Sequence, residues 1–208
     1  MTVDPDQDPA GAGEGRIENV TGVLLVPSRH GDGLIALAVK RLAGVLADLF
    51  EEVLIVGADP PGNTRARRVT PGSGPANGLR DLSAALDVAT SPRVCAVSSD
   101  FPLLSPDVLL MLVAYPEADA VAPRVLGRDQ PLCAIYAREP ASSAARARLR
   151  EGASDPADLL AVLALQRVDP ADLETVDPGA RSFERLATPD AVAHLESLLA
   201  SDAGDSAG

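Results

Sequence analysis

Short apolar runs alternate with longer amphipathic stripes along the chain, and this alternation predicts its fold. Runs of four apolar residues, typical of strands buried on both faces of a sheet, occur at 23–26, 53–56 and 94–97. Apolar residues at helical spacings of three and four follow the first two runs, at 35–49 and 79–89. Each of these two strands is therefore predicted to lead into a helix.

The second half of the chain continues the alternation with shorter elements. The sequence predicts strands at 120–122 and 132–136 and helices near 140–150, 156–166 and 189–200. Ser105 precedes Pro106 and Thr188 precedes Pro189, and a hydroxyl residue followed by proline is typical of a helix start. Ser105 and Thr188 are therefore predicted to cap helices.

Strands that alternate with helices predict a three-layer α/β fold, in which helices cover both faces of a Rossmann-like, mostly parallel sheet. Ligands of such sheets bind at the carboxyl ends of the strands. The loops at 27–33, 57–78 and 98–105 follow the three buried strands. The sequence therefore predicts a binding site formed by these three loops.

The composition indicates one domain between two polar ends. The chain has 208 residues, of which 46% are hydrophobic, so one sizeable core can form. Residues 1–18 and 201–208 carry almost no large apolar side chain, so we predict a disordered N-terminal segment, a domain at 19–200 and a flexible tail. No apolar run approaches the ~20 residues that span a bilayer, and the acidic N-terminus does not resemble a secretory signal. We therefore expect a cytoplasmic protein.

The charge of the chain limits its partners. The net charge is −12 and the pI is near 4.5, and such a surface repels phosphate backbones. We therefore expect no binding to nucleic acid. A nucleotide can still bind an acidic protein at a local positive group or through a metal ion. Lys40 is the only lysine, and arginine supplies the other basic side chains.

The loop after the first strand is a candidate phosphate-binding loop. It contains Ser28, Arg29 and Gly31. Its glycine permits close approach of the backbone to a ligand, and the following helix offers free N–H groups and the positive end of its dipole. Arg29 could donate two hydrogen bonds to a phosphate. The alternative is an ordinary polar turn between a strand and a helix.

Asp100 ends the third buried strand and precedes the apolar, proline-containing segment 101–104. A carboxylate at this point faces the predicted site. Mg²⁺ takes one or two protein carboxylates together with phosphate oxygens, so Asp100 is a candidate ligand of Mg²⁺. The alternative is that Asp100 caps a helix or a turn.

The loop before the second helix carries a weaker signal. Gly74, Pro75 and Gly78 lie where the backbone could contact a base or a ribose. Glycine and proline mark any loop, so these residues alone are not specific.

A second weak signal lies between the two later strands. Arg124, Gln130 and Pro131 occur there, and the two polar side chains could bind a polar second substrate. The alternative is a solvated, hairpin-like loop.

Four segments, within about residues 20–200, resemble the molybdenum cofactor guanylyltransferase family, a branch of the nucleotidyltransferases. GVLLVPSRHG at 22–31 resembles the opening strand and phosphate loop of the family, and GPANGL at 74–79 resembles its guanine-side loop. VSSDFPLL at 97–104 resembles the strand that ends in the metal-binding aspartate. QPLCAIY at 130–136 resembles a segment near the pterin substrate. The last two segments are the most specific, and all four stand in the order of the family.

The resemblance implies a fold of the nucleotide-diphospho-sugar transferase type and transfer of GMP from GTP to molybdopterin with Mg²⁺, which releases pyrophosphate. It implies that Asp100 binds the metal and that Asp100 and Arg29 are the catalytic residues. It places the nucleotide at Ser28, Arg29, Gly31, Gly74, Pro75 and Gly78, and the pterin at Arg124, Gln130 and Pro131. The implied partners are GTP and molybdopterin, together with molybdoenzyme-maturation proteins; the charge and the short apolar runs already predict neither nucleic acid nor a membrane as a partner.

The chain departs from the family pattern in the phosphate loop. Val26, Pro27 and Ser28 stand where the family has twin glycines, and the positions of its aspartate and lysine fall on Gly33 and Leu34. Two alternatives to a guanylyltransferase therefore stay open. One is a catalytically impaired relative that binds nucleotide, pterin or a partner, and the other is a related nucleotidyltransferase that acts on another small phosphate ester.

Overall fold

The computed structural model describes residues 15–27, 33–62, 64–71, 77–184 and 197. Its main feature is a seven-stranded sheet in the order β3-β2-β1-β4-β8-β5-β9. The strands are β1 (Ile17–Leu25), β2 (Phe50–Val56), β3 (Arg67–Val69), β4 (Arg93–Ser98), β5 (Ala120–Ala122), β8 (Cys133–Ala137) and β9 (Leu165–Arg167). β8 runs antiparallel to β4 and β5, and the other pairings are parallel. The predicted mostly parallel sheet is confirmed.

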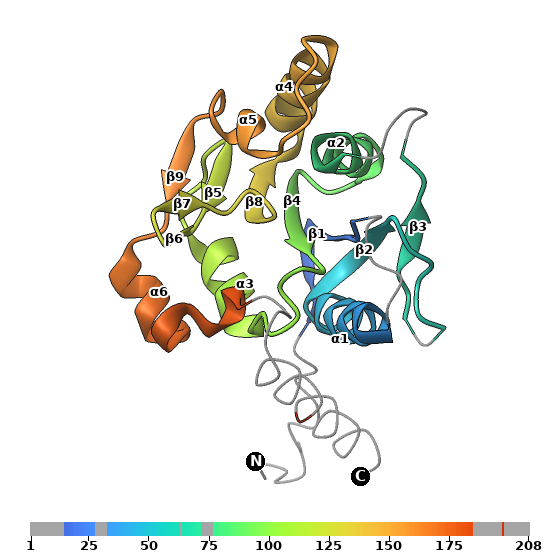
Figure 1. The fold of residues 1–208 in the computed structure, drawn as a ribbon, viewed down its shortest axis with the longest axis vertical. Helices are drawn as coiled ribbons and strands as arrows, with labels where there is room; N and C mark the ends of the chain where they lie inside the picture. The colour runs from blue at the N-terminus through green and yellow to red at the C-terminus, as the bar shows by residue number, and fades with distance from the viewer. Residues whose placement is uncertain (1–14, 28–32, 63, 72–76, 185–196, 198–208) are drawn as a thin grey trace, which may run out of the picture.

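Helices cover both faces of this sheet, as Figure 1 shows. The apolar side chains of α1 (Gly33–Leu49), α3 (Pro106–Ala114) and α6 (Pro170–Val176) pack on one face. Those of α2 (Gly78–Val88), α4 (Arg138–Arg150) and α5 (Ala157–Leu160) pack on the other. A short 3₁₀ helix, η1 (Pro178–Phe183), follows α6. The three-layer α/β class predicted from the sequence is therefore confirmed.

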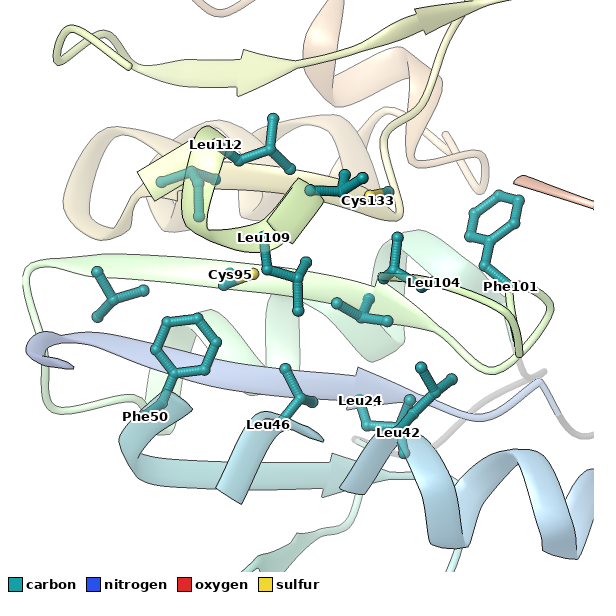
Figure 2. Packing of buried hydrophobic residues seen from close by; sticks show 14 of the residues in the cluster. Leu24, Leu42, Leu46, Phe50, Cys95, Phe101, Leu104, Leu109, Leu112 and Cys133 are labelled. Carbon is teal, nitrogen blue, oxygen red and sulfur yellow. The ribbon is translucent and has the colours of Figure 1, made fainter. Parts of the chain in front are cut away.

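The core between the sheet and the α1 side holds large aliphatic and aromatic side chains. Figure 2 shows Leu42 and Leu46 of α1 close to Leu24 of β1, and Leu109 of α3 above Cys95 of β4. Successive side chains of a strand point to opposite faces, so the buried runs of β1, β2 and β4 fill both cores. Both cysteines of the chain are free thiols within this packing.

The predicted elements agree with the structure in kind, and two boundaries need correction. β1 begins at Ile17, so Ile17 and Glu18 belong to the sheet and not to the N-terminal segment at 1–18. Residues 20–25 of β1 are buried, but Thr21 and Gly22 lie among them, so the apolar run marked only the end of the strand. The helix predicted at 156–166 is the four-residue α5, because Leu165–Arg167 pairs with β5 as the edge strand β9. The helix predicted at 189–200 lies outside the described residues, apart from a helical Ser197.

Capping follows the sequence where the structure describes it. The Ser105 hydroxyl accepts a hydrogen bond from the backbone N–H of Asp107, and Pro106 is the first residue of α3. Thr188 lies outside the described residues. In the described part of the chain, no helix is both long and apolar enough to span a bilayer.

A hydrogen-bond network around one carboxylate, that of Glu52, links β1 to the amino-terminal end of β2. Glu52 of β2 accepts hydrogen bonds from the hydroxyl of Thr21 at 2.6 Å and from the backbone N–H and hydroxyl of Thr90, each at 2.8 Å. Arg67 of β3 donates to its other oxygen at 3.1 Å. Burial raises the pKa of Glu52, but these hydrogen bonds together outweigh it, so the pKa is lowered from 4.5.

We expect Glu52→Gln to destabilise the protein by about 1–2 kcal/mol at pH 7, because the amide presents an N–H group to donors that need an acceptor. A carboxylate with a lowered folded-state pKa stabilises the fold above its unfolded-state pKa and loses that contribution as the pH falls through the folded-state pKa. The difference between wild type and variant should therefore shrink below about pH 4.5. Urea denaturation across pH 3–7 measures this difference in the free energy of unfolding.

The matched control is Glu51→Gln, since Glu51 is exposed and, among the described residues, forms only a 3.7 Å ion pair with Arg65. An equal loss in both variants at pH 7 would contradict this prediction.

Candidate functional site

The carboxyl ends of the three buried strands lie together at one edge of the sheet. Leu25 of β1 pairs with Val56 of β2 on one side and with Ser98 of β4 on the other. The three strands are parallel, so the loops that follow them leave from the same edge, as the sequence predicted. Of the predicted site residues on these loops, Ser28, Arg29, Gly31, Gly74 and Pro75 lie outside the described residues. Asp100 and Gly78 are described.

Asp100 lies in a turn that is fixed to β1 and β4. The backbone N–H of Asp100 donates to the Ser98 hydroxyl at 3.1 Å, and the N–H of Phe101 donates to the Ser98 carbonyl at 3.1 Å. The N–H of Ser99 donates to the Leu25 carbonyl at 2.9 Å. Asp100 is half-buried, and its carboxylate takes part in no hydrogen bond or ion pair with another described residue. The backbone is thus held while the carboxylate stays available to a ligand.

The carboxylate fits Mg²⁺ as one ligand of a site completed by others. Among the described residues, no group of three or more acidic, cysteine or histidine side chains could enclose a metal by itself. Mg²⁺ is commonly held by one or two carboxylates, with water and substrate phosphates as the remaining ligands, so one free carboxylate matches that pattern. The adjacent Ser99 hydroxyl is also buried without a hydrogen-bond partner in the described structure. The metal assignment itself stays a prediction.

Leu132 joins three of the predicted segments. Its carbonyl accepts a hydrogen bond from the backbone N–H of Ser98 at 2.8 Å, which ties the segment before β8 to the Asp100 turn. Its side chain lies near the start of α2, where a Cβ atom added to Gly78 would be 3.9 Å from its Cδ1. The structure therefore brings together the end of β4, the start of α2 and the Gln130–Leu132 segment.

Gln130 and Pro131 form a turn with several internal bonds. The N–H of Gln130 donates to the Pro123 carbonyl at 3.0 Å, and the carbonyl of Gln130 accepts from the N–H of Cys133 at 3.2 Å. The hydroxyl of Tyr136, which is fully buried, donates to the Pro131 carbonyl at 2.7 Å. These bonds hold both predicted residues at the edge of the sheet that carries Asp100.

Arg124 lies in a separate hairpin formed by β6 (Arg124–Val125) and β7 (Arg128–Asp129). Its Nε donates to the Gly127 carbonyl at 3.0 Å and lies 4.0 Å from the Asp129 carboxylate. Arg167 of β9 donates two hydrogen bonds from Nε and NH2 to the same carboxylate, and this pairing lowers the pKa of Asp129. The guanidinium of Arg124 is thus engaged within the hairpin, and no contact among the described residues joins it to Asp100. The structure therefore confirms that this segment forms a hairpin, which the sequence offered as the alternative to a binding loop.

Gly78 is the first residue of α2 and has a packing reason to be glycine. A Cβ atom at this position would lie 3.0 Å from Cγ of Pro156. Asn77 caps the helix, since its side chain accepts from the backbone N–H of Arg80 at 2.7 Å. The start of α2 therefore packs closely against the segment before α5. Whether its backbone also contacts a nucleotide stays a prediction.

Three residues that support this edge had no signal in the sequence. Arg41 of α1 donates hydrogen bonds to the carbonyls of Pro102 and Leu104. The Ser182 hydroxyl accepts from the N–H of Ser105 at 3.0 Å, and the ring of Phe183 meets that of Phe101 edge to face, with centroids 5.5 Å apart. A single arginine within an amphipathic helix, or a Ser-Phe pair far along the chain, carries no pattern that identifies such contacts.

Comparisons with known proteins identify the family and the fold of this chain. A family model described as "MobA-like NTP transferase domain" matches residues 24–168. A curated protein of Pelotomaculum thermopropionicum, named "Probable molybdenum cofactor guanylyltransferase", is 33% identical over 106 residues. That match covers 48% of this chain and 50% of the relative, so the chain spans about half the length of the curated relative it matches.

Two solved structures are similar in fold. Molybdopterin-guanine dinucleotide biosynthesis protein A from Archaeoglobus fulgidus has a TM-score of 0.65 at 19% identity, over 86% of this chain and 99% of the other. A 2-C-methyl-D-erythritol 4-phosphate cytidylyltransferase from Thermus thermophilus has a TM-score of 0.58, also at 19% identity, over 85% and 97%. At such identities these neighbours establish the nucleotide-diphospho-sugar transferase type of fold.

Proposed function

This chain belongs to the MobA-like NTP transferase family, and we propose from that membership that it is a guanylyltransferase of molybdenum cofactor assembly. The reaction is the transfer of GMP from GTP to molybdopterin, which releases pyrophosphate. The match to a named guanylyltransferase supports this choice among nucleotidyltransferases. The observation that carries the proposal is the Asp100 carboxylate, which is held by its backbone at the carboxyl edge of the sheet but is unpaired with the described residues.

The reaction requires the protein to position both substrates and to neutralise the charge of the triphosphate. A phosphate oxygen of the pterin attacks the α-phosphorus of GTP, and the bond from that phosphorus to the oxygen of the leaving pyrophosphate breaks. Asp100 would hold Mg²⁺, which neutralises charge on the triphosphate when bound. Arg29 would contact the phosphates, and Gln130 with Pro131 would face the pterin. Such an arrangement accelerates the reaction by fixing both substrates in line.

An impaired relative that binds nucleotide without turnover is the second candidate. The position of the family lysine falls on Leu34, and Lys40, the only lysine of the chain, is exposed within α1 beyond that position. Val39 and Leu42 beside it are buried, so Lys40 belongs to the solvent side of the helix. Loss of one electrostatic donor to a transition state typically costs about 10²–10³ in rate. This departure favours weak binding of triphosphate and slow transfer.

One assay separates these candidates and a third, a transferase for another phosphate ester. The protein is incubated with Mg²⁺, each nucleoside triphosphate in turn, and molybdopterin or 2-C-methyl-D-erythritol 4-phosphate as acceptor. Pyrophosphate release with GTP and molybdopterin alone supports the guanylyltransferase. Release with another pair supports the third candidate. GTP binding without release under any condition supports the impaired relative.

Restoring the family loop should strengthen binding of the triphosphate. We expect replacement of residues 27–34 by a glycine-rich segment with an aspartate and a lysine to raise GTP affinity about tenfold, because a charge-assisted hydrogen bond contributes ~1.5–3 kcal/mol. Val26 is left in place, since it is buried and its N–H donates to the Val56 carbonyl at 2.9 Å. Titration calorimetry with GTP and Mg²⁺ measures the change. The control graft carries methionine in place of the lysine, and an equal gain from both grafts would contradict the role of the charge.

A further inference from the structure

Arg41 places a buried guanidinium against the turn that carries Asp100. The residue lies in α1 and is 8% exposed. Its NH1 atom donates hydrogen bonds to the Pro102 carbonyl at 2.8 Å and to the Leu104 carbonyl at 3.0 Å. These two carbonyls belong to the segment that begins two residues after Asp100. α1 is thereby bonded to the backbone of that turn.

A buried guanidinium destabilises the fold unless its N–H groups form hydrogen bonds. Burial of a charged group opposes folding, and an aliphatic residue would fill the space without that cost. Backbone carbonyls that leave a strand need hydrogen-bond partners, and the NH1 nitrogen of Arg41 carries two N–H groups that reach two of them at once. These two hydrogen bonds account for a buried donor at this position, and they make the turn depend on it.

The same turn is also held by η1. The N–H of Ser105 donates to the Ser182 hydroxyl at 3.0 Å, and the N–H of Ser182 is held by the carboxylate of Asp177 at 3.1 Å. Phe183 packs edge to face on Phe101. The turn is thus held by Ser98 at its start, by Arg41 of α1 and by η1, while the carboxylate of Asp100 is left without a bond to the described residues.

We propose that Arg41 is a positioning residue for Asp100, which acts by fixing the Pro102 and Leu104 carbonyls so that the carboxylate meets Mg²⁺ in one orientation. This inference rests on the proposed function, because it assigns Arg41 to the metal side of that site. Groups that orient a metal ligand typically change metal affinity or activity 10–100-fold when removed. Arg41 itself would touch neither substrate nor metal.

The test compares GTP affinity with and without Mg²⁺ by titration calorimetry, in wild type, Arg41→Met, Asp100→Asn and the double variant. Arg41→Met should lower the gain in affinity that Mg²⁺ confers by about tenfold and leave binding without Mg²⁺ unchanged. In the Asp100→Asn background, Arg41→Met should have no further effect, because the carboxylate it positions is gone. Arg41→Lys keeps the charge but not the forked donors. It should show a smaller loss of the same kind, and it carries the test if the methionine variant does not fold.

Arg93→Met is the matched control, since NH2 of Arg93 donates to the Val113 carbonyl at 3.0 Å from the other end of β4. It should lower the melting temperature without changing the gain from Mg²⁺. The inference is overturned if the Arg41 variants keep the full gain, or if Arg41→Met weakens binding equally in the Asp100→Asn background. If wild type shows no Mg²⁺-dependent binding of GTP, the proposed function fails and the inference fails with it. That result is recognised from the wild-type protein alone.

Discussion

Asp100→Asn is expected to reduce Mg²⁺-dependent guanylyl transfer by about 10²-fold or more, since removal of one group that stabilises transition-state charge typically costs ~10²–10³. The amide keeps the size of the side chain but loses its charge. The backbone bonds of the turn do not involve the carboxylate, so the fold should be unchanged. Pyrophosphate release as a function of Mg²⁺ concentration measures the loss, and the melting temperature checks the fold.

Asp107→Asn is the control for that experiment. Asp107 is exposed in the first turn of α3, seven residues further along the same segment, and its removal changes the net charge equally. It should leave transfer within about twofold of wild type, as expected for a surface charge that is largely screened by salt. Equal rates in wild type and in Asp100→Asn would remove Asp100 from the site.

Gly57→Ala is expected to destabilise the protein by on the order of 3 kcal/mol, which corresponds to a fall in melting temperature of about 10 °C for a chain of this size. Gly57 follows β2 with a φ of +90°, a conformation that side chains other than glycine rarely adopt. An added Cβ would lie 2.2 Å from the Val26 carbonyl oxygen, which is backbone of the neighbouring strand end and cannot move aside alone. Thermal unfolding followed by circular dichroism measures the effect.

Gly44→Ala is the matched control, and we expect it to raise the melting temperature slightly instead of lowering it. Gly44 lies within α1, and a Cβ atom added there meets no atom within 4 Å. Alanine in a helix is favoured over glycine by about 0.5–1 kcal/mol, so this variant should melt slightly higher than wild type. If both variants were neutral, the close approach of Gly57 to Val26 would not describe the protein in solution.

The sequence could predict the layers of this fold because the strongest signals were local. Buried strands such as β4 are continuous apolar runs, and the stripe along α1 has a clear helical period. The direction of a strand could not be predicted, because an apolar run has the same pattern in a parallel and in an antiparallel strand. The reversal of β8 therefore needed the structure. Short edge strands such as β3 and β9 were also missed, since three partly exposed residues make no periodic pattern.

The site could be predicted only where one residue followed directly from a strand end. Asp100 was predicted in this way, and the structure confirms that it follows the carboxyl end of β4, while its role stays a prediction. Its supports were not found, because Arg41 and Ser182 come from segments about 60 and 80 residues away in the sequence and act on backbone carbonyl and N–H groups. Any residue type can offer a backbone carbonyl or N–H group, so the sequence does not show which residues accept or donate such contacts. Arg124 shows the converse, since its type suggested a ligand while its partners lie in its own hairpin.

The reversal of β8 determines where this chain can lengthen without losing its site. An antiparallel strand begins at the edge where its parallel neighbours end, so the segment that enters β8 lies beside the turn that leaves β4. Before that segment the chain makes the β6–β7 hairpin, whose tip residue Leu126 is 97% exposed and has a φ of +49°. Residues inserted at this tip would extend into solvent, while the bond between Ser98 and Leu132 keeps the register of the sheet. Divergence in the length of this hairpin is therefore uncoupled from the strand ends that hold Asp100.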